Sequence, residues 1–432
     1  MFQSVFMIYP QALTRRQRRK TQKNYCIFCG LNGISYMCLG ETIIVLFAIK
    51  LNAPNSMVAA LGAMIYFSFF MLPIGKIVAA KVGAARSQAV FWTLRNIVAI
   101  GVGLSAVTEY YGYHTLALVQ VLLGACLFYG LRAAGVVMSQ PFIGDMATTR
   151  ERPQLIGISN ALFYGGCMAA LLVIWYVLSL RESIWVITMI IGFGACMGVT
   201  STRYIRRMDE SSAMIEAARR PILNDIRASW QLPVVRKLLM AMFTAYLAII
   251  MLGSVSMLSL KRGYGVSDTA ALFFSLMQFT ASGIFSFTSG RIVARIGSNK
   301  ALYIGVGSLL VVGILWLVAP EKLNYFYAVI IFFLVGAANV ICGNSLLNYY
   351  LQNTPQKLWV STSMLTSVVT SVGAGVAGML LSSLIFKIVE SKEGDFTALG
   401  RFRLYFLITL LLIGVFSYFI WKLPESQKTL EK

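Results

Sequence analysis

Long apolar runs constrain this chain more than any other feature. Each is about as long as the ~20 residues that an α-helix needs to cross the hydrocarbon core of a bilayer, and short polar segments separate them. With 58% apolar residues, 12% charged residues and a mean hydropathy of +0.74, the 432-residue chain is too apolar for a soluble or disordered protein. We therefore predict an all-α membrane protein.

Twelve runs meet this length criterion. The first is too long for the core of a cleavable signal, so we expect it to be retained as a helix. The predicted spans are 25-49, 56-74, 88-108, 115-139, 156-180, 183-200, 238-260, 269-289, 301-319, 325-350, 359-386 and 404-421.

The distribution of Lys and Arg predicts the orientation of these spans. The formal net charge is +21, and most of the 37 cations fall before the first run, in alternate loops and at the end of the chain. Because such cations concentrate on the cytoplasmic side, both termini are predicted to be cytoplasmic. Cations placed in this way also argue against nucleic-acid binding. The predicted outside loop 387-403, with four cations and three acids, fits least well.

One polar stretch, 201-237, separates six runs from six. We expect a basic N-terminal segment (1-24), a six-helix bundle (25-200), this linker, a second six-helix bundle (238-421) and a cytoplasmic tail (422-432). The arginine-rich composition of the linker favours a helix lying on the anionic inner leaflet. A regulatory docking site is the alternative.

A short basic turn occurs twice in the chain. Residues 80-86 read AKVGAAR and residues 294-300 read ARIGSNK, and each copy lies between two apolar runs. Segments 153-162 and 355-365, which both begin with Pro-Gln, align at a similar separation of roughly 210 residues. The chain therefore looks like two six-helix halves running in the same direction, which is an arrangement of transporters with a site at the membrane midplane.

The repeated turn resembles the motif that follows helices 2 and 8 in the major facilitator superfamily. The resemblance covers nearly the whole chain and implies twelve helices in two parallel repeats, cytoplasmic termini and secondary transport by alternating access. It also implies that the turn residues gate the cytoplasmic side. Those residues are Lys81, Gly83, Arg86, Arg295, Gly297 and Lys300.

Both copies depart from the family pattern. Ala80 and Ala294 stand where the motif has an acid, and Lys76 stands at the opening glycine of the first copy, with Gly75 one residue earlier. In relatives that acid helps to hold the cytoplasmic side closed. The chain therefore resembles a subgroup that lacks the acid and must hold its gate in another way.

Glu41 is the acid that lies deep within a predicted span. An ionisable group there costs at least a few kcal/mol unless it is paired or hydrated, so it is our first functional candidate. Burial favours the protonated carboxyl, which would let Glu41 take up and release a proton during transport. The alternative is a hydrogen-bonded structural carboxylate.

Arg132, in a loose match to the family's arginine-glycine motif of helix 4, is the second candidate. Side chains lean toward the N-terminus of their own helix, so Glu41 and Arg132 are predicted to converge near the midplane. The alternatives for Arg132 are helix packing or a pairing with Asp145. Arg95 leans back toward the cytoplasm, and we expect it to extend to the headgroups.

Asn32 and Tyr36 lie one turn apart on the first span, whereas at ~100° per residue Glu41 points to nearly the opposite side. Either Glu41 faces the cavity and Asn32 packs against a neighbouring helix, or the reverse; we retain Glu41. The other polar candidates are each as well explained by a hydrogen bond between helices. They are Asn160, Tyr246, Gln278, Asn339 and Asn344.

Motifs of soluble enzymes are missing from the sequence, and its one histidine, His114, lies in a predicted loop. The seven cysteines are scattered, so even the Cys26–Cys29 pair is expected to be a packing feature. We therefore expect no enzyme activity, no metal and no cofactor. A membrane enzyme or receptor is disfavoured because no set of polar residues converges at one depth.

We expect a secondary active transporter that moves a small organic solute by alternating access, coupled to a gradient of protons or another ion. It is predicted to act as a monomer in the cytoplasmic membrane, a bacterial inner membrane, with anionic lipids facing its cytoplasmic side. The alternative is a flippase for lipids or lipid-linked substrates, or an exporter of amphipathic compounds, on the same fold.

Overall fold

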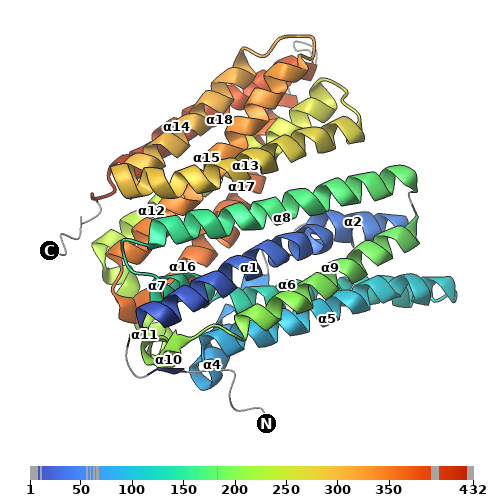
Figure 1. The fold of residues 1–432 in the computed structure, drawn as a ribbon. Coiled ribbons are helices and arrows are strands. Elements are labelled where there is room, and N and C mark those ends of the chain that lie inside the picture. Colours follow the sequence, from blue (N-terminus) through green and yellow to red (C-terminus); the bar gives the residue numbers. More distant parts are fainter. Residues whose placement is uncertain are drawn as a thin grey trace. The chain divides into compact units, whose positions relative to one another are not determined.

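The structure is a computed structural model, and almost all of it is helical (Figure 1). In hydrocarbon, helices satisfy their own backbone hydrogen bonds, which explains this composition. Within the described part of the chain, 11 helices are long and apolar enough to cross a membrane. Much of the predicted second span, 56-74, lies outside that part. The described residues are 8-9, 12-54, 57-58, 60-61, 64, 68-181, 183-390 and 398-425.

Contacts divide the chain into two compact units. Unit 1 comprises 1-155, 162-225 and 356-364, and unit 2 comprises 156-161, 226-355 and 365-432. Each unit therefore contains one short segment that belongs, by its position in the sequence, to the other half of the chain.

Unit 1 is built around the first helices and the linker. Its apolar core lies between the first, third, fourth and sixth spans and includes Phe47, Val121 and Ile187. The elements that begin in it are β1 (Ile8–Tyr9), α1 (Arg15–Leu39), α2 (Glu41–Lys50), η1 (Ser68–Met71), α4 (Leu72–Val82), α5 (Ala84–Tyr110), α6 (His114–Val136), α7 (Ser139–Met146), α8 (Arg152–Leu180), α9 (Ile184–Ile205), β2 (Glu210–Ser211), α10 (Ser212–Arg219) and α11 (Ile222–Gln231).

Unit 2 repeats this helical plan. Its twelfth-span helix, α18, and its ninth-span helix, α14, pack on the others through large aromatic residues, including the stacked rings of Trp316 and Phe406. Its elements, with the segment of unit 1 that interrupts them, are α12 (Pro233–Leu258), η2 (Ser259–Gly263), α13 (Asp268–Ile296), α14 (Ser298–Leu317), α15 (Tyr325–Asn353), η3 (Gln356–Leu358), α16 (Trp359–Ser367), η4 (Val368–Gly373), α17 (Ala374–Glu390) and α18 (Ala398–Trp421).

The first span is two helices, which corrects the prediction of one uninterrupted helix. α1 ends at Leu39, Gly40 is extended (φ −66°, ψ 168°), and α2 begins at Glu41. α1 also begins at Arg15, well before the predicted start, because Thr14 and Gln17 form a capping box there. Hydropathy is continuous across Gly40, so the pattern of apolar residues gave no sign of the break.

The first part of the linker is folded onto unit 1, a packing that the sequence did not predict. β2 pairs in parallel with β1, with Glu210 opposite Ile8. α10 then buries Met214, Ile215, Ala217 and Ala218. α11 is the part that still fits an interfacial helix, because it exposes Leu223 and Trp230.

The two copies of the basic turn adopt the same backbone conformation. Gly83 between α4 and α5 has φ 97° and ψ 164°, and Gly297 between α13 and α14 has φ 89° and ψ 160°. Residues with a side chain rarely adopt positive φ, so the conserved geometry explains why both copies carry glycine at this point. The agreement supports the predicted duplication.

Gly297→Ala is expected to destabilise the protein by about 1–2 kcal/mol, because alanine strains a backbone held at positive φ. Gly307→Ala is the matched control: it lies within α14, and a Cβ there would meet nothing within 4 Å. The control should be neutral or slightly stabilising. Thermal unfolding of the detergent-solubilised variants measures the difference, and equal effects would contradict the assigned role of the turn.

Candidate functional site

Arg95 is buried inside unit 1, which corrects the expectation that it extends to the headgroups. Its side chain is 1% exposed. The guanidinium lies 4.4 Å from the centre of the Trp92 ring and 5.5 Å from that of Phe128, so two aromatic faces contact the cation. Direction along the helix favoured the membrane surface, but these rings and an acceptor on α1 give the cation partners in the interior.

That acceptor is Asn32, whose side chain connects α1 to α5. Its Oδ1 accepts hydrogen bonds from Nη2 of Arg95 at 3.0 Å and from Nε1 of Trp92 at 2.9 Å. Asn32 therefore packs against a neighbouring helix, as one of the two predicted alternatives required. Its function in this structure is to hold Arg95 in place.

Arg132 faces the same region from α6. Its guanidinium lies 5.2 Å from the centre of the Tyr36 ring, and that ring also contacts Phe163 of α8, with the two centroids 5.5 Å apart. The predicted alternative of a pairing with Asp145 is wrong, because the Asp145 carboxylate accepts hydrogen bonds from the backbone and hydroxyl of Ser211 instead.

The two arginines line one small cavity at the break in the first span. Its volume is about 10 Å³, close to the least that a single water molecule needs. The structure thus brings Arg132 and Tyr36 together, and adds Arg95, at the point where the first span is interrupted. The lining residues are Tyr36, Leu39, Gly40, Arg95, Phe128, Tyr129 and Arg132.

Glu41 follows this cavity directly in the chain. Glu41 is the first residue of α2, and the structure describes its backbone but not its side chain. The angular argument that set Glu41 opposite Asn32 and Tyr36 assumed a continuous helix, and the break at Gly40 removes that assumption. The N-terminus of a half-helix carries a partial positive charge, which favours an acid at this position.

The polar candidates of the second half fall into two groups within unit 2. Asn160 of α8 donates to Oδ1 of Asn344 at 2.6 Å, and Nδ2 of Asn344 donates to Ser289 at 2.6 Å. Asn339 shares a face of α15 with Gly343, beside which the Tyr246 hydroxyl lies. Asn160 and Asn344 are therefore hydrogen-bonded to each other, as their structural interpretation predicted.

Gln278 and Asn339 remain half-buried polar residues in unit 2. In the part of the chain that the structure describes, neither side chain has a hydrogen-bond partner. Gln278 lies on α13 where that helix approaches Gly336 of α15. These two residues and Tyr246 could therefore contact a ligand through uncharged polar groups.

The basic turn of unit 1 has an acid after all, supplied by the linker. The Glu210 carboxylate accepts hydrogen bonds from the backbone N–H groups of Ala84 at 2.7 Å and Ala85 at 3.1 Å. These N–H groups begin α5, where a negative charge is favoured. Arg86 is close enough to favour the charged carboxylate, while Lys81 is exposed to solvent. Glu210 thus lies at the turn from which the motif acid is missing.

Two neighbours of Glu210 hold the same stretch of linker. Asp209 forms an ion pair with Lys20 at 3.3 Å and its backbone N–H donates to Thr21, while Ser211 binds Asp145. Sequence reasoning missed this segment. A signal was present, since Asp-Glu-Ser after the sixth span is matched by Pro-Glu-Ser after the twelfth.

The corresponding contact in unit 2 uses a side chain of the turn itself. Nδ2 of Asn299 donates to the carbonyl groups of Leu423 at 3.0 Å and Pro424 at 2.6 Å. Arg295 and Lys300 on either side are exposed. In both units, then, the chain that follows the sixth helix packs onto the basic turn.

Lys76, which replaces the opening glycine of the motif, is a buried cation. Its side chain is 1% exposed, and Nζ donates to the Ser361 hydroxyl at 3.2 Å. Ser361 belongs to the segment 356-364, which packs in unit 1 although it comes from the second half of the chain. Beside it, Trp359 packs on Gly144 and lies 5.0 Å from the Arg152 guanidinium.

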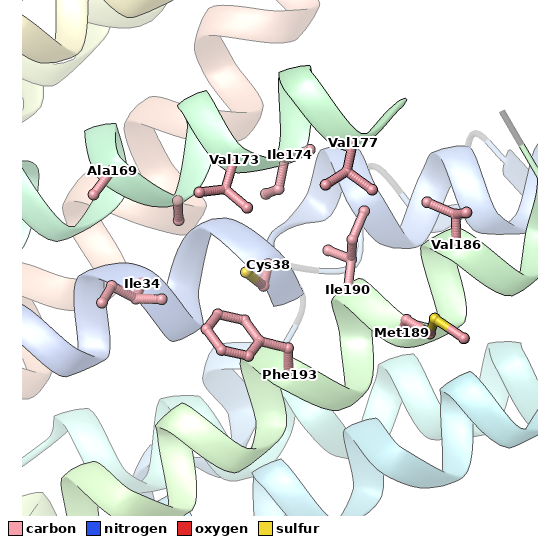
Figure 2. Close-up of a pocket in the computed structure, with 11 residues that line it drawn as sticks. Ile34, Cys38, Ala169, Val173, Ile174, Val177, Val186, Met189, Ile190 and Phe193 are labelled. Carbon is pink, nitrogen blue, oxygen red and sulfur yellow. The ribbon is translucent and has the colours of Figure 1, made fainter. Parts of the chain in front are cut away.

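Unit 1 also contains an apolar pocket of about 310 Å³ between α1, α8 and α9. Figure 2 shows Ile34 and Cys38 of α1 facing Val173 of α8 and Phe193 of α9 across it. Several lining side chains, such as Met189 at 73% exposure, are open to the surroundings of the helices. The pocket fits a hydrocarbon chain and offers almost no polar group to a hydrophilic solute.

Residues 26–378 match the sequence profile of the Major Facilitator Superfamily. Curated protein sequences give no match.

Solved structures with the same fold include several transporters. The fucose:proton symporter of E. coli has a TM-score of 0.70 at 13% identity, covering 94% of this chain and 99% of its own. The proton:xylose symporter XylE, bound to 6-bromo-6-deoxy-D-glucose, has a TM-score of 0.68 at 12% identity, with 96% and 97% covered. The human organic anion transporter MFSD10 has a TM-score of 0.64 at 13% identity, with 92% and 99% covered.

Asn32→Leu is expected to destabilise unit 1 by about 2–4 kcal/mol, because the buried donors of Arg95 and Trp92 both lose their acceptor. Asn32→Asp keeps an acceptor and should restore most of the loss. Asn24→Leu on the same helix removes only an exposed hydrogen bond to Arg207 and is the control, with an effect below about 1 kcal/mol. Chemical unfolding in detergent measures all three; a loss in Asn32→Leu no larger than in the control would refute the role given to Asn32.

The pH dependence of stability should report on Glu210. Burial raises the pKa of Glu210 from 4.5 to about 7, against the two N–H bonds, which lower it. The native state therefore binds this proton more tightly than the unfolded chain. The stabilisation of the fold by the bound proton is lost as the pH rises through about 7. Between pH 5 and pH 8, wild type should lose up to about 3 kcal/mol relative to Glu210→Gln.

Glu216→Gln, an exposed glutamate of α10, is the control and should keep the wild-type pH profile. Thermal unfolding across this pH range gives the comparison. Parallel profiles for wild type and Glu210→Gln would show that the carboxyl does not titrate in this window.

Proposed function

Because the chain belongs to the major facilitator superfamily, we propose that it is a secondary active transporter for a small organic solute that carries an anionic group, coupled to protons. The family assignment makes it a multi-pass membrane transporter and not an enzyme. The solute and the coupling ion are the proposed part. The named solved structures carry sugars or organic anions, and at 12–13% identity they are evidence of the fold alone.

The observation that supports an anionic solute is the pair of arginines at one interrupted helix. Arg95 and Arg132 line the same cavity, and within the described residues no carboxylate pairs with either one. Two cations close together in a bundle repel each other, so the site needs an anion. The fork-shaped guanidinium suits a carboxylate or a phosphate.

Glu41 is proposed to be that anion when the solute is absent. As the first residue of α2 it follows the cavity directly. A solute carboxylate that binds the arginines would displace Glu41, and the displaced carboxyl would take up a proton. Solute and proton would then move together, because each stabilises the state that binds the other.

The polar residues of unit 2 are proposed as ligand contacts in their own right. Tyr246, Gln278 and Asn339 offer a hydroxyl and two amides without a charge. Asn160 and Asn344 are already bonded to each other, so their proposed role is to hold segment 156-161 on α15 within unit 2.

The proposed orientation places the turn at Gly83 on the cytoplasmic side. The basic N-terminal segment, this turn and the linker lie together at one end of unit 1, as the contacts of Lys20 with Asp209 and of Glu210 with Ala84 require. Cations gathered at one end support a cytoplasmic placement, with anionic inner-leaflet lipids beside them. We retain a monomer in a bacterial inner membrane as part of this proposal.

An exporter or flippase of amphipathic compounds is the second candidate. The apolar pocket between α1, α8 and α9 favours it, because a hydrocarbon chain could enter there (Figure 2). Under this proposal, the substrates would be lipids or drug-like cations and anions. Lipid scrambling in liposomes would then require this pocket. Val173→Trp would fill it while leaving the arginine site unchanged.

A stability screen of purified protein identifies the solute class, since a ligand that binds only the folded protein raises the melting temperature, and a tighter ligand raises it further. Organic anions should stabilise wild type, and Arg132→Gln should lose at least about tenfold in apparent affinity. Stabilisation by neutral sugars alone, unchanged in Arg132→Gln, would overturn the anionic solute.

Glu41→Gln is expected to bind that solute at least as tightly as wild type, because the competing carboxylate is gone, and to lose proton-coupled flux. Proteoliposomes loaded with a pH-sensitive dye report proton entry when solute is added, and labelled solute reports exchange in the absence of a gradient. Exchange should persist in Glu41→Gln while proton entry falls to background. Unchanged proton entry would remove Glu41 from the coupling mechanism.

A further inference from the structure

Unit 2 contains a basic pocket of its own. Its volume is about 550 Å³, within the usual range for ligand sites. It is formed where α12, α17 and α18 end or begin. The lining residues are Leu258, Arg262, Ser383, Phe386, Lys387, Arg401 and Phe402.

Three of the described residues that line this pocket are cations, and none of its described lining residues is acidic. Within the described residues, Arg262, Lys387 and Arg401 have no ion pair and no hydrogen bond. In addition, Nε of Arg401 is buried without a partner. Three like charges around one cavity are unfavourable unless an anion occupies it, and a buried donor without an acceptor costs further free energy.

The floor of the pocket is aromatic and firmly supported. Phe386 packs edge-on against Phe402, with centroids 5.6 Å apart, and stacks on Tyr405 at 4.6 Å. The Tyr405 hydroxyl is in turn hydrogen-bonded to Ser382 at 2.7 Å. The pocket thus has a charged rim over an apolar base, which suits an amphipathic anion better than a fully hydrated one.

A local distortion of α12 helps to form the rim. η2 is a π-helical turn that carries Arg262. The backbone N–H of Tyr264 donates to the Ser259 carbonyl, and the Tyr264 hydroxyl donates to the Pro320 carbonyl. Such turns are retained mostly at functional sites, because the wider helix is less stable. Next to it, Arg403 is occupied by the carbonyl of Ala319 and takes no part in the pocket.

An apolar strip on α17 leads away from the pocket. Leu380, Ser383, Leu384, Lys387 and Ile388 share one face of the helix by their spacing. Leu380, Leu384 and Ile388 are 66%, 53% and 49% exposed, so this face is in contact with hydrocarbon in a membrane. The basic residues sit where the helix ends, at the depth of lipid headgroups.

We infer that this pocket binds the anionic headgroup of a phospholipid, with Arg262, Lys387 and Arg401 around the phosphate and one acyl chain along the exposed face of α17. Arg262, Lys387 and Arg401 lie in or beside loops that are predicted to be on the outer side of the membrane. Cations in an outside loop work against the orientation signal of the chain, and a bound anionic lipid gives them a function.

The test uses full-length protein in nanodiscs of phosphatidylcholine, alone or with one third phosphatidylglycerol. The anionic lipid should raise the melting temperature of wild type, and Lys387→Gln or Arg401→Gln should weaken apparent lipid affinity by about tenfold each. Lys387→Arg should retain the wild-type shift. Lys322→Gln removes an exposed cation from the loop between α14 and α15 and is the charge-matched control.

Equal unfolding temperatures of all variants in pure phosphatidylcholine establish that the substitutions leave the fold intact. No shift in wild type, or a shift lost equally in Lys322→Gln, would overturn the site. Stabilisation by inorganic phosphate in phosphatidylcholine nanodiscs, at the same degree as by the lipid, would instead assign it to a free anion.

Discussion

A cation buried among membrane helices needs partners from those helices, and Arg95 sets this requirement in unit 1. Two rings and the amide oxygen of Asn32 meet it. Because the acceptor is on α1 and the cation on α5, their hydrogen bond ties α1 to α5 on the N-terminal side of the break at Gly40. The second arginine, Arg132, can then approach the break without displacing the first.

The basic turn of unit 1 illustrates how one physical requirement can be met from a different part of the chain. The N-terminus of α5 attracts a carboxylate whether the acid comes from the preceding helix or from the linker. In this chain Glu210 supplies it, together with the parallel pairing of β1 and β2. The hydrogen bonds at the start of α5 therefore depend on the linker and on the ionisation of Glu210.

The sequence was sufficient for the features that depend on composition and periodicity. Long apolar runs predicted the spans, and the repeated glycine predicted the two turns at Gly83 and Gly297, because each feature is local. The burial of Arg95 depended on Asn32, which is remote in sequence, so neither residue alone could indicate it. The break at Gly40 was hidden because apolar composition does not record a backbone dihedral angle.

Other errors have the same origin in contacts between distant segments. The linker before α10 is held on unit 1 by three consecutive residues, each with a different partner. Asp209 pairs with Lys20, Glu210 accepts from Ala84, and Ser211 donates to Asp145. Composition alone showed only a basic linker. An interhelical hydrogen bond was the interpretation given to Asn344, but its partner, Asn160, was visible only in the structure.

The exchanged segments of the two units have a consequence for the order of biosynthesis. Trp359 fills the space over Gly144, and Ser361 accepts from Lys76, so unit 1 is incomplete until residues 356-364 have been made. Asn160 of α8 likewise lacks its partner until Asn344 has been synthesised. While the ribosome extends the second half, the first half holds a buried lysine without its acceptor. Neither half can therefore reach its final packing as an independent domain, and a chain that stops before residue 364 would leave an unfinished first unit in the membrane.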